Sequence, residues 1–198
     1  MSVRPVEWHR SLVTACEPGG DIALAAARTT VLDFLRRAER PFERTAYDPG
    51  HLTASAIVVP PGAAGCLLVW HRRLGRWLQP GGHIDPPDRD AAHAARREAV
   101  EETGVQLLDS DGAPVLVGVD VHTIPAAGTE PRHRHFDLCF LFVAADTRIR
   151  AAAENPRVRW CGWTDLPQIA ADTALLRHAA RARRYLTAPG IAPVSPRN

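Results

Sequence analysis

Three glutamates are placed where one turn of a helix would bring them together. Glu98, Glu101 and Glu102 stand at positions i, i+3 and i+4, which share one face of a helix. Like charges at this spacing cost a helix about 0.2–0.5 kcal/mol per pair, so a purely structural helix gains nothing from them. A bound divalent cation would be stabilised by them. The alternative interpretation is a solvated helix face, because Arg97 and Glu101 are also i, i+4 neighbours.

The residues around these glutamates predict a helix with a defined beginning and end. Residues 89–103 form an uninterrupted helical stretch after a loop rich in proline and glycine. Asp88 or Asp90 is placed to accept from the first free backbone N–H groups, and Gly104 to end the helix in the left-handed conformation. Small side chains give the helix a face that can pack closely against a sheet: Ala91, Ala94, Ala95, Ala99 and Val100.

The stretch that begins at Gly82 resembles the signature of the Nudix hydrolases. That signature is a glycine, any five residues, a glutamate, any seven residues, Arg-Glu, an apolar residue, any residue, Glu-Glu, any residue, a glycine and an apolar residue. Asp88 stands where the signature has its first glutamate, and eight rather than seven residues separate it from Arg97. Either the loop holds one extra residue or the helix begins one residue later, so the role of Asp88 stays open. The matching positions are Gly82, Arg97, Glu98, Ala99, Glu101, Glu102, Gly104 and Val105.

The resemblance implies a pyrophosphohydrolase that cleaves a phosphoanhydride with Mg²⁺, or with Mn²⁺ as the alternative. Hard divalent cations bridge carboxylates and phosphates, polarise the phosphoryl oxygen and lower the pKa of a bound water. The expected metal ligands are Glu98, Glu101, Glu102 and the backbone carbonyl of Gly82. Glu98 or Glu101 doubles as the general base if no other acid lies closer, so the identity of the base stays open, and Arg97 orients a glutamate rather than touching substrate.

A second group of polar residues follows two strand-like runs. His133, His135 and Asp137 share one face of a strand, and Asp120 and His122 share one face of the run before it. If the two strands pair, the imidazoles gather at one end of the sheet, where they would contact phosphate, a base or a further metal. The alternative is half-solvated histidines at strand ends. The expected substrate-binding residues are His83, Asp85, His122, His133, His135, Asp137 and Arg76, and the candidates for an additional acid are Asp88 and Glu154.

The substrate class is predicted less sharply than the chemistry. A nucleoside diphosphate derivative, or a similar small-molecule diphosphate, is the leading hypothesis, and the alternative is a non-catalytic, nucleotide-binding regulatory domain. Markers that the family places downstream of its signature for ADP-ribose and dinucleoside polyphosphate substrates are absent. Isomerisation of a prenyl diphosphate is disfavoured because Cys66 lies in an apolar run without matching surroundings.

Length and composition favour one domain with extensions. The 198 residues carry a formal charge of only +2, which gives no electrostatic case for a nucleic-acid or membrane partner. Four scattered cysteines and no signal-peptide run predict free thiols and a cytoplasmic protein. A homodimer is left open. The expected organisation is an N-terminal helical extension at 1–46, a Nudix domain at 47–187 that includes a C-terminal helix, and a flexible tail at 188–198.

Periodicity predicts the remaining elements. Residues 21–40 form an amphipathic helix that Pro41 stops, and residues 173–186 form a closing helix. Together with the resemblance, which covers about residues 51–166, this pattern predicts an α/β fold, namely a Nudix-type α/β/α sandwich around a mixed β-sheet with an added N-terminal helix. The expected strands are 51–59, 66–71, 76–79, 115–122, 135–145 and 157–163.

Overall fold

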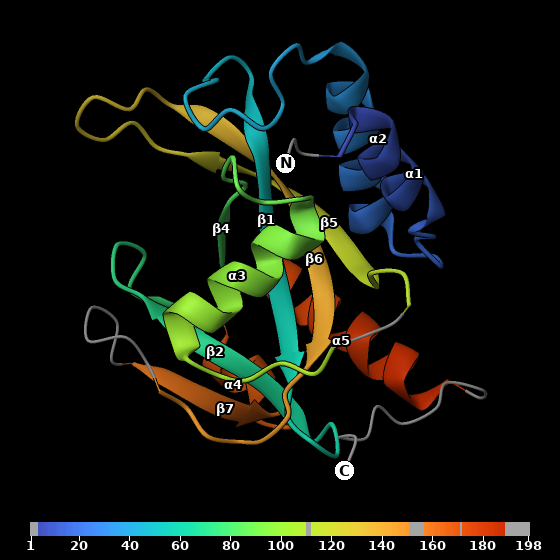
Figure 1. Cartoon of the computed structure of the whole chain (residues 1–198), viewed down its shortest axis with the longest axis vertical. Coiled ribbons are helices and arrows are strands. Elements are labelled where there is room, and N and C mark those ends of the chain that lie inside the picture. The colour runs from blue at the N-terminus through green and yellow to red at the C-terminus, as the bar shows by residue number, and fades with distance from the viewer. Residues whose placement is uncertain (1–3, 110–111, 151–156, 171, 189–198) are drawn as a thin grey trace.

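Strand β1 is buried at every position, because it lies inside a sheet that is covered on both faces. The computed structural model describes residues 4–109, 112–150, 157–170 and 172–188 (Figure 1). In chain order its elements are α1 (Val6–Ala15), α2 (Ile22–Arg37), β1 (Gly50–Val59), β2 (Gly65–His71), β3 (Arg76–Leu78), β4 (Gly81–His83), α3 (Ala91–Thr103), β5 (Leu116–Ile124), β6 (His133–Val143), β7 (Val158–Gly162), α4 (Leu166–Ile169) and α5 (Thr173–Thr187).

The larger sheet is mixed. Its strand order is β4-β1-β6-β5, in which β1 and β6 run parallel while β4 and β5 each pair antiparallel with their neighbour. A smaller antiparallel sheet has the order β3-β2-β7. The predicted mixed sheet is therefore confirmed, and the parallel pair places residues of two distant segments side by side.

The two faces of the larger sheet carry different layers. Leu52, Ala54 and Ala56 of β1 belong to one hydrophobic core with α1, α2 and α3. Ile57 and Val59 point to the other face, where α4, α5 and the smaller sheet form a second core. Figure 1 shows α3 in front of the sheet and α5 behind it. Helices on both faces confirm the predicted α/β/α arrangement.

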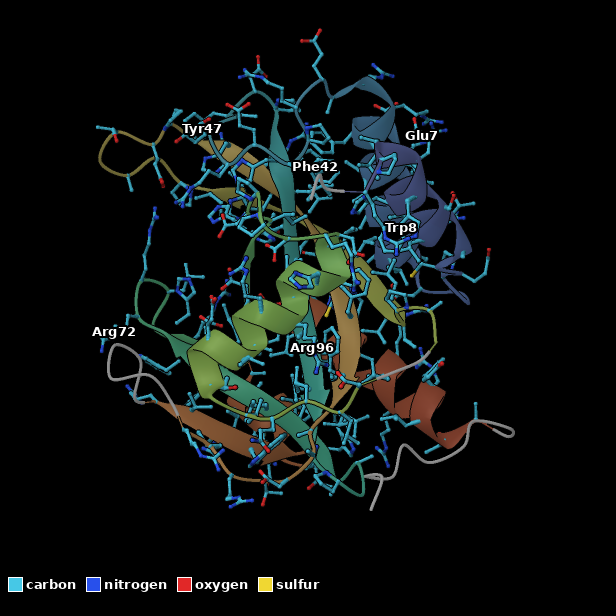
Figure 2. The ribbon with its side chains drawn as sticks, in the orientation of Figure 1. Glu7, Trp8, Phe42, Tyr47, Arg72 and Arg96 are labelled. Atoms are coloured by element: carbon cyan, nitrogen blue, oxygen red, sulfur yellow. The ribbon has the colours of Figure 1, made fainter. Side chains whose placement is uncertain are left out.

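The N-terminal segment contains two helices where one was predicted. The second, α2, ends at Arg37 and packs against β5, whereas α1 packs on α2. Sequence periodicity missed α1 because one of its two buried residues is a histidine, His9, beside the apolar Val13. Phe42, in the loop between α2 and β1, faces α1 (Figure 2), and the centroid of its ring lies 4.9 Å from that of His9.

Two local differences concern the stretch that carries the glutamates. Residues 81–83 form the short edge strand β4, which was predicted as part of a loop. Helix α3 begins at Ala91 because the side chain of Asp90, not that of Asp88, accepts a hydrogen bond from the backbone N–H of His93 at 2.9 Å. Asp88 is thereby free for another role.

The structure does not test the expectations for Glu154, for the C-terminal tail and for the domain boundaries. Glu154 and residues 189–198 of the expected tail fall outside the described residues, and the division at 46/47 and 187/188 stays a prediction. Among the described helices, none is both long enough and apolar enough to cross a membrane.

The end of α3 gives a stability prediction. Gly104 has φ +65°, and a Cβ built there would lie 2.2 Å from the carbonyl oxygen of Arg150. Gly75 has nearly the same φ of +61° but open space around it. We expect Gly75→Ala to lower the free energy of unfolding by about 1–2 kcal/mol, the cost of the left-handed conformation. Gly104→Ala adds a clash with backbone of about 1–3 kcal/mol. Equal losses in chemical denaturation would contradict this account of Gly104.

Candidate active site

The guanidinium of Arg97 lies at the centre of the acidic residues. One terminal nitrogen, Nη1, donates to Glu98 Oε1 at 2.8 Å and to Glu101 Oε2 at 3.0 Å. The other, Nη2, donates to Asp88 Oδ2 at 2.8 Å and to the backbone carbonyl of His83 at 2.9 Å. The hydrogen bonds that Arg97 donates to Asp88 are the largest cause of the raised pKa of Arg97, and those to Glu98 and Glu101 add to it, whereas desolvation by burial opposes them. Arg97 therefore fixes acids of the helix relative to the loop before it.

Asp88 is fully buried and anchors this arrangement. Its Oδ2 accepts from the backbone N–H of Asp85 at 2.8 Å, and its Oδ1 lies 2.9 Å from Nδ1 of His93. Burial on its own would raise the pKa of Asp88, but hydrogen bonds from Arg97, Asp85 and His93 outweigh it and lower the pKa. The position at which the sequence departs from the Nudix signature thus still holds an acid paired with the signature arginine.

Glu98 packs directly beneath Gly82. A Cβ built on Gly82 would lie 2.6 Å from both Cδ and Oε1 of Glu98, so only glycine lets the carboxylate occupy this position. Burial raises the pKa of Glu98, against the opposing effect of Arg97. A partly buried carboxylate is thus pressed against the backbone of β4.

Glu102 reaches the open edge of β4. Its Oε2 accepts from the backbone N–H of Gly81 at 3.1 Å. Burial raises the pKa of Glu102 to about 7; the Gly81 N–H opposes this shift, and the charges of Glu98 and Glu101 add to it.

The pairing of β4 with β1 decides which carbonyl of β4 is free. The backbone N–H of Ala56 donates to the carbonyl of Pro80, and the direction of these groups alternates along an antiparallel strand. The backbone N–H and C=O of Gly82 therefore point toward β1, and the carbonyl of Gly81 points to the open edge. The edge carbonyl beside Glu102 is therefore that of Gly81, whereas the sequence had indicated Gly82.

The other face of the sheet carries five imidazoles, which we call the histidine cluster: His51, His83, His122, His133 and His135. The register explains it, because His135 of β6 lies opposite His51 of β1 on one side and His122 of β5 on the other. The ring centroid of His135 lies 4.8 Å from that of His51 and 5.4 Å from those of His83 and His122. The predicted gathering of histidines at one end of the sheet is therefore present.

Charge states differ within the histidine cluster. Burial lowers the pKa of His51 to about 4, and burial together with the neighbouring imidazoles lowers the pKa of His135 to about 2. Burial also lowers the pKa of His83. Burial would lower the pKa of His122 too, but a hydrogen bond to Asp120 and nearby acidic charges raise it above its ordinary value. The lowered pKa values of His51 and His135 favour the uncharged form of these two rings at neutral pH.

A comparison with known families identifies the chain. The family model described as NUDIX domain matches residues 49–187. The chain belongs to the Nudix family.

Solved structures of Nudix proteins share the fold. The NUDIX domain of Shewanella oneidensis NrtR, complexed with ADP ribose, is 20% identical with a TM-score of 0.51, and the match covers 78% of this chain and 97% of that one. A NUDIX-family hydrolase from Clostridium perfringens is 24% identical with a TM-score of 0.50, covering 69% and 97%. A C. elegans Ap4A hydrolase binary complex is 19% identical with a TM-score of 0.47, covering 68% and 96%. No curated protein matches the chain.

The Nudix helix and the histidine cluster lie on opposite faces of the larger sheet. Gly82, above Glu98, pairs with Ala54, whose side chain belongs to the core on the α3 face. His83 pairs with Thr53 on the other face. His83 still joins the two regions, because its carbonyl accepts from Arg97 while its ring contacts His51 at 5.1 Å between centroids.

The remaining predicted site residues are distributed more widely. Asp85 lies near the Nudix arginine, with 3.5 Å between its Oδ2 and Nη2 of Arg97. Asp137 is buried and accepts from the hydroxyls of Thr53 at 2.9 Å and Ser55 at 2.5 Å. Arg76 lies on β3 in the smaller sheet and pairs with Asp172 at 3.6 Å.

Sequence reasoning missed three residues of this region. His51, Thr53 and Ser55 share one face of β1, but the run that contains them reads only as a buried strand. Their partners are more than 80 residues away in the chain, and only the parallel pairing with β6 brings them together. The alternation of His51, Thr53 and Ser55 was the available signal.

The Asp88–Arg97 pair gives a prediction of pH dependence. The pKa of Asp88 is lower in the folded chain than its ordinary 3.8. The stabilisation by this ionised group is therefore fully present above pH 3.8 and is lost as the pH falls through the folded-state pKa. We expect Asp88→Asn to lower the free energy of unfolding at neutral pH by about 3 kcal/mol, because it leaves Arg97 without its main partner. Urea denaturation from pH 7 downward should show this difference narrowing below pH 3.8.

Asp109 provides a matched control, since it pairs with Arg96 but is 95% exposed. Asp109→Asn should change the free energy of unfolding by less than about 1 kcal/mol. The role assigned to Asp88 would be contradicted if Asp88→Asn lowered the free energy of unfolding no more than Asp109→Asn does, or by an amount that did not change with pH.

Proposed function

We propose that this Nudix protein is a Mg²⁺-dependent pyrophosphohydrolase that cleaves a phosphoanhydride in a nucleoside diphosphate derivative or a similar small diphosphate. The observation that carries the proposal is the set of bonds made by Arg97 to Glu98, Glu101 and Asp88. A helix that was merely solvated would not hold one guanidinium against a fully buried aspartate and two helical glutamates.

The donor set fits a hard divalent cation. Glu98, Glu101 and Glu102 offer only carboxylate oxygens, and Glu102 is compensated by a single backbone N–H from Gly81. Oxygen ligands with room for retained water and substrate phosphate suit Mg²⁺, and Mn²⁺ accepts the same set. The edge carbonyl of Gly81 completes the oxygens at this position.

The bound cation would neutralise the phosphate charge and acidify water. The protein's own groups position the carboxylates and accept the proton of the attacking water. Gly82 lets the backbone of β4 approach the carboxylate of Glu98 closely, and Gly81 N–H holds Glu102 in place. Arg97 orients Glu98 and Glu101, and these two carboxylates are the bases that can take a proton from the attacking water.

The proposal includes the class of substrate and the cellular compartment. A diphosphate linked to a second group is the form of substrate that a carboxylate site with bridging cations suits best. The four free cysteines, all buried, support a reducing and hence cytoplasmic compartment. Because a small diphosphate is the expected substrate, the full chain should be tested on small molecules first.

A panel of nucleoside diphosphate derivatives and other diphosphates, with Mg²⁺ or Mn²⁺ and read by product masses, tests the activity. ADP ribose belongs in the panel because that ligand occupies the NUDIX domain of the Shewanella oneidensis protein. Product masses name both the substrate and the bond broken. Binding of a nucleotide without metal-dependent product would reject the hydrolase and favour a regulatory, nucleotide-binding domain.

Removing one carboxylate charge should strongly reduce turnover without unfolding the protein. Glu102→Gln keeps the size of the side chain and an acceptor for Gly81 N–H, but it removes a ligand charge. We expect kcat/KM to fall by at least about 100-fold, the scale of losing a catalytic group of this kind. Glu7→Gln, on the exposed surface of α1, is the control and should retain full activity. Full activity of the Glu102 variant would reject the ligand assignment.

Gly82→Ala separates geometry from charge. The added methyl would displace the flexible end of Glu98 while leaving every charge in place. We expect a loss of turnover with a melting temperature close to that of the wild type, because a side-chain end can move where backbone cannot. The same substitution at Gly81 meets the backbone of Ala54 and Ser55 and should instead destabilise the fold. Retained activity in Gly82→Ala would show that the position of Glu98 is not critical.

A further inference from the structure

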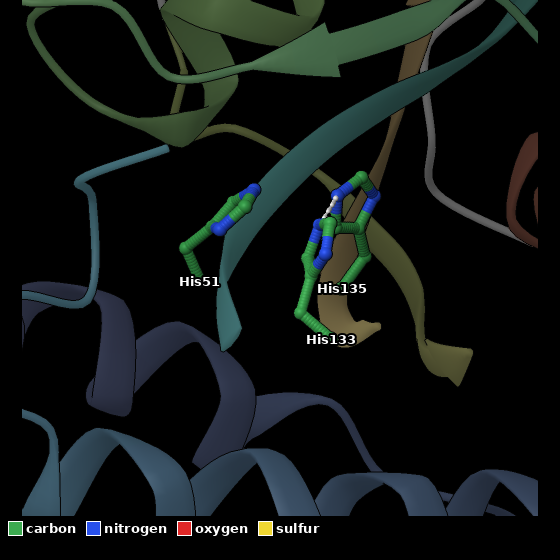
Figure 3. Close-up of side chains that lie close together, drawn as sticks. All are labelled: His51, His133 and His135. Atoms are coloured by element: carbon green, nitrogen blue, oxygen red, sulfur yellow. Dashed lines mark hydrogen bonds between the residues drawn. The ribbon is translucent and has the colours of Figure 1, made fainter. Parts of the chain in front are cut away.

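Three members of the histidine cluster bring their ring nitrogens together. His51 of β1 and His133 and His135 of β6 each offer a nitrogen, and these atoms lie within 4.8 Å of one another. Figure 3 shows the rings of His133 and His135 side by side, with His51 facing them from the neighbouring strand. His51 lies opposite His135 in the parallel register, and His133 precedes it by two residues on the same face.

The backbone fixes which nitrogen of two of these rings is free. Nδ1 of His51 lies 3.2 Å from the carbonyl of Ala46, and Nδ1 of His133 lies 2.8 Å from the carbonyl of Pro131. A carbonyl oxygen only accepts, so in both rings Nδ1 carries the proton and donates it. In the neutral ring Nε2 then holds a lone pair. Metal-ligating histidines are typically oriented in this way, by an N–H donated to a backbone carbonyl.

The free nitrogen of His51 is not satisfied by the described part of the protein, and that of His133 has only another imidazole as its partner. Nε2 of His51 is buried and has no hydrogen-bond partner among the described residues. Nε2 of His133 faces Nε2 of His135 at 3.2 Å, and only one of these two can gain a proton from the other. Two imidazoles on one ion, with bonds of about 2.0–2.1 Å, hold their nitrogens roughly 2.9–3.4 Å apart at right-angle to tetrahedral geometry. The observed spacing of this pair therefore fits two ligands of one ion, and the ligand nitrogen of His51 lies within 4.8 Å of both.

We propose that His51, His133 and His135 form a binding site for a divalent transition-metal ion of the Zn²⁺ class. Imidazole nitrogens favour Zn²⁺, Co²⁺ and Ni²⁺, whereas Mg²⁺ requires oxygen ligands, so this site and the Nudix carboxylates select different ions. His51 and His133 are buried and His135 is only partly buried, so a fourth position on the ion is left for water or an anionic ligand. The three histidines lie on the face of the sheet opposite the Nudix glutamates, so the site does not rest on the proposed hydrolase function.

Zinc content tests the proposal directly. The full chain, stripped of metal and then dialysed against Zn²⁺ with Mg²⁺ in large excess, should retain one Zn²⁺ per chain by elemental analysis. His133→Ala should weaken the affinity by more than about 100-fold, since losing even the hydrogen-bond partner of a ligand costs about 10–100-fold. His51→Gln, which keeps the size of the side chain and preserves the strand, should do the same. Circular dichroism confirms that each variant is folded.

Two controls distinguish this site from the Nudix helix. The double variant Glu98→Gln/Glu102→Gln should keep its Zn²⁺, and His71→Ala, on the β2–β3 hairpin outside the cluster, should keep it as well. Co²⁺ in place of Zn²⁺ should give visible d–d bands that disappear in His133→Ala. A wild-type chain that binds no Zn²⁺, a folded His133→Ala or His51→Gln that still binds it, or loss of Zn²⁺ in the glutamate double variant would each overturn the proposal. None of these measurements depends on hydrolysis.

Discussion

The pairing of Arg97 with Asp88 is the interaction on which the rest of the site depends. A fully buried carboxylate is costly unless it is paired and hydrogen-bonded, and Asp88 has its charge matched by Arg97 and its remaining lone pairs taken by Asp85 and His93. Once this ion pair fixes the guanidinium, its other nitrogen can hold Glu98 and Glu101. The loop before the helix and the acidic face of the helix are thereby locked in one relative position.

The parallel pairing of β1 and β6 provides the second constraint. Because side chains alternate along a strand, one register places small and apolar residues against α3 and polar residues on the opposite face. Asp137 then bonds Thr53 and Ser55, and His51 meets His135. The same two strands therefore support the carboxylate site on one face of the sheet and bear the imidazoles on the other. A shift of one residue would exchange the two sets.

The sequence predicted the parts of this site that depend on local spacing. The i, i+3, i+4 glutamates, the glycine that ends the helix and the α/β/α sandwich all follow from short-range patterns. Other parts depend on which strands pair and in which register, and no local pattern encodes that. They are the place of His51 in the histidine cluster and the position of the Gly81 carbonyl at the sheet edge. Helix α1 was missed for a different reason: a buried histidine interrupted its apolar pattern. The role of Asp88 needed the helix start, which Asp90 decides.

The shortness of β4 has a consequence for the behaviour of the chain in solution. An edge strand exposes backbone N–H groups that can recruit a strand from another molecule, and long, unprotected edges promote aggregation. Here the edge spans only three residues, two of which are glycine, and the outward N–H of Gly81 is already bonded to Glu102. The carboxylate that we propose as a metal ligand thus also occupies the outward N–H of this edge, so the same contact protects β4 from pairing with a strand of another molecule.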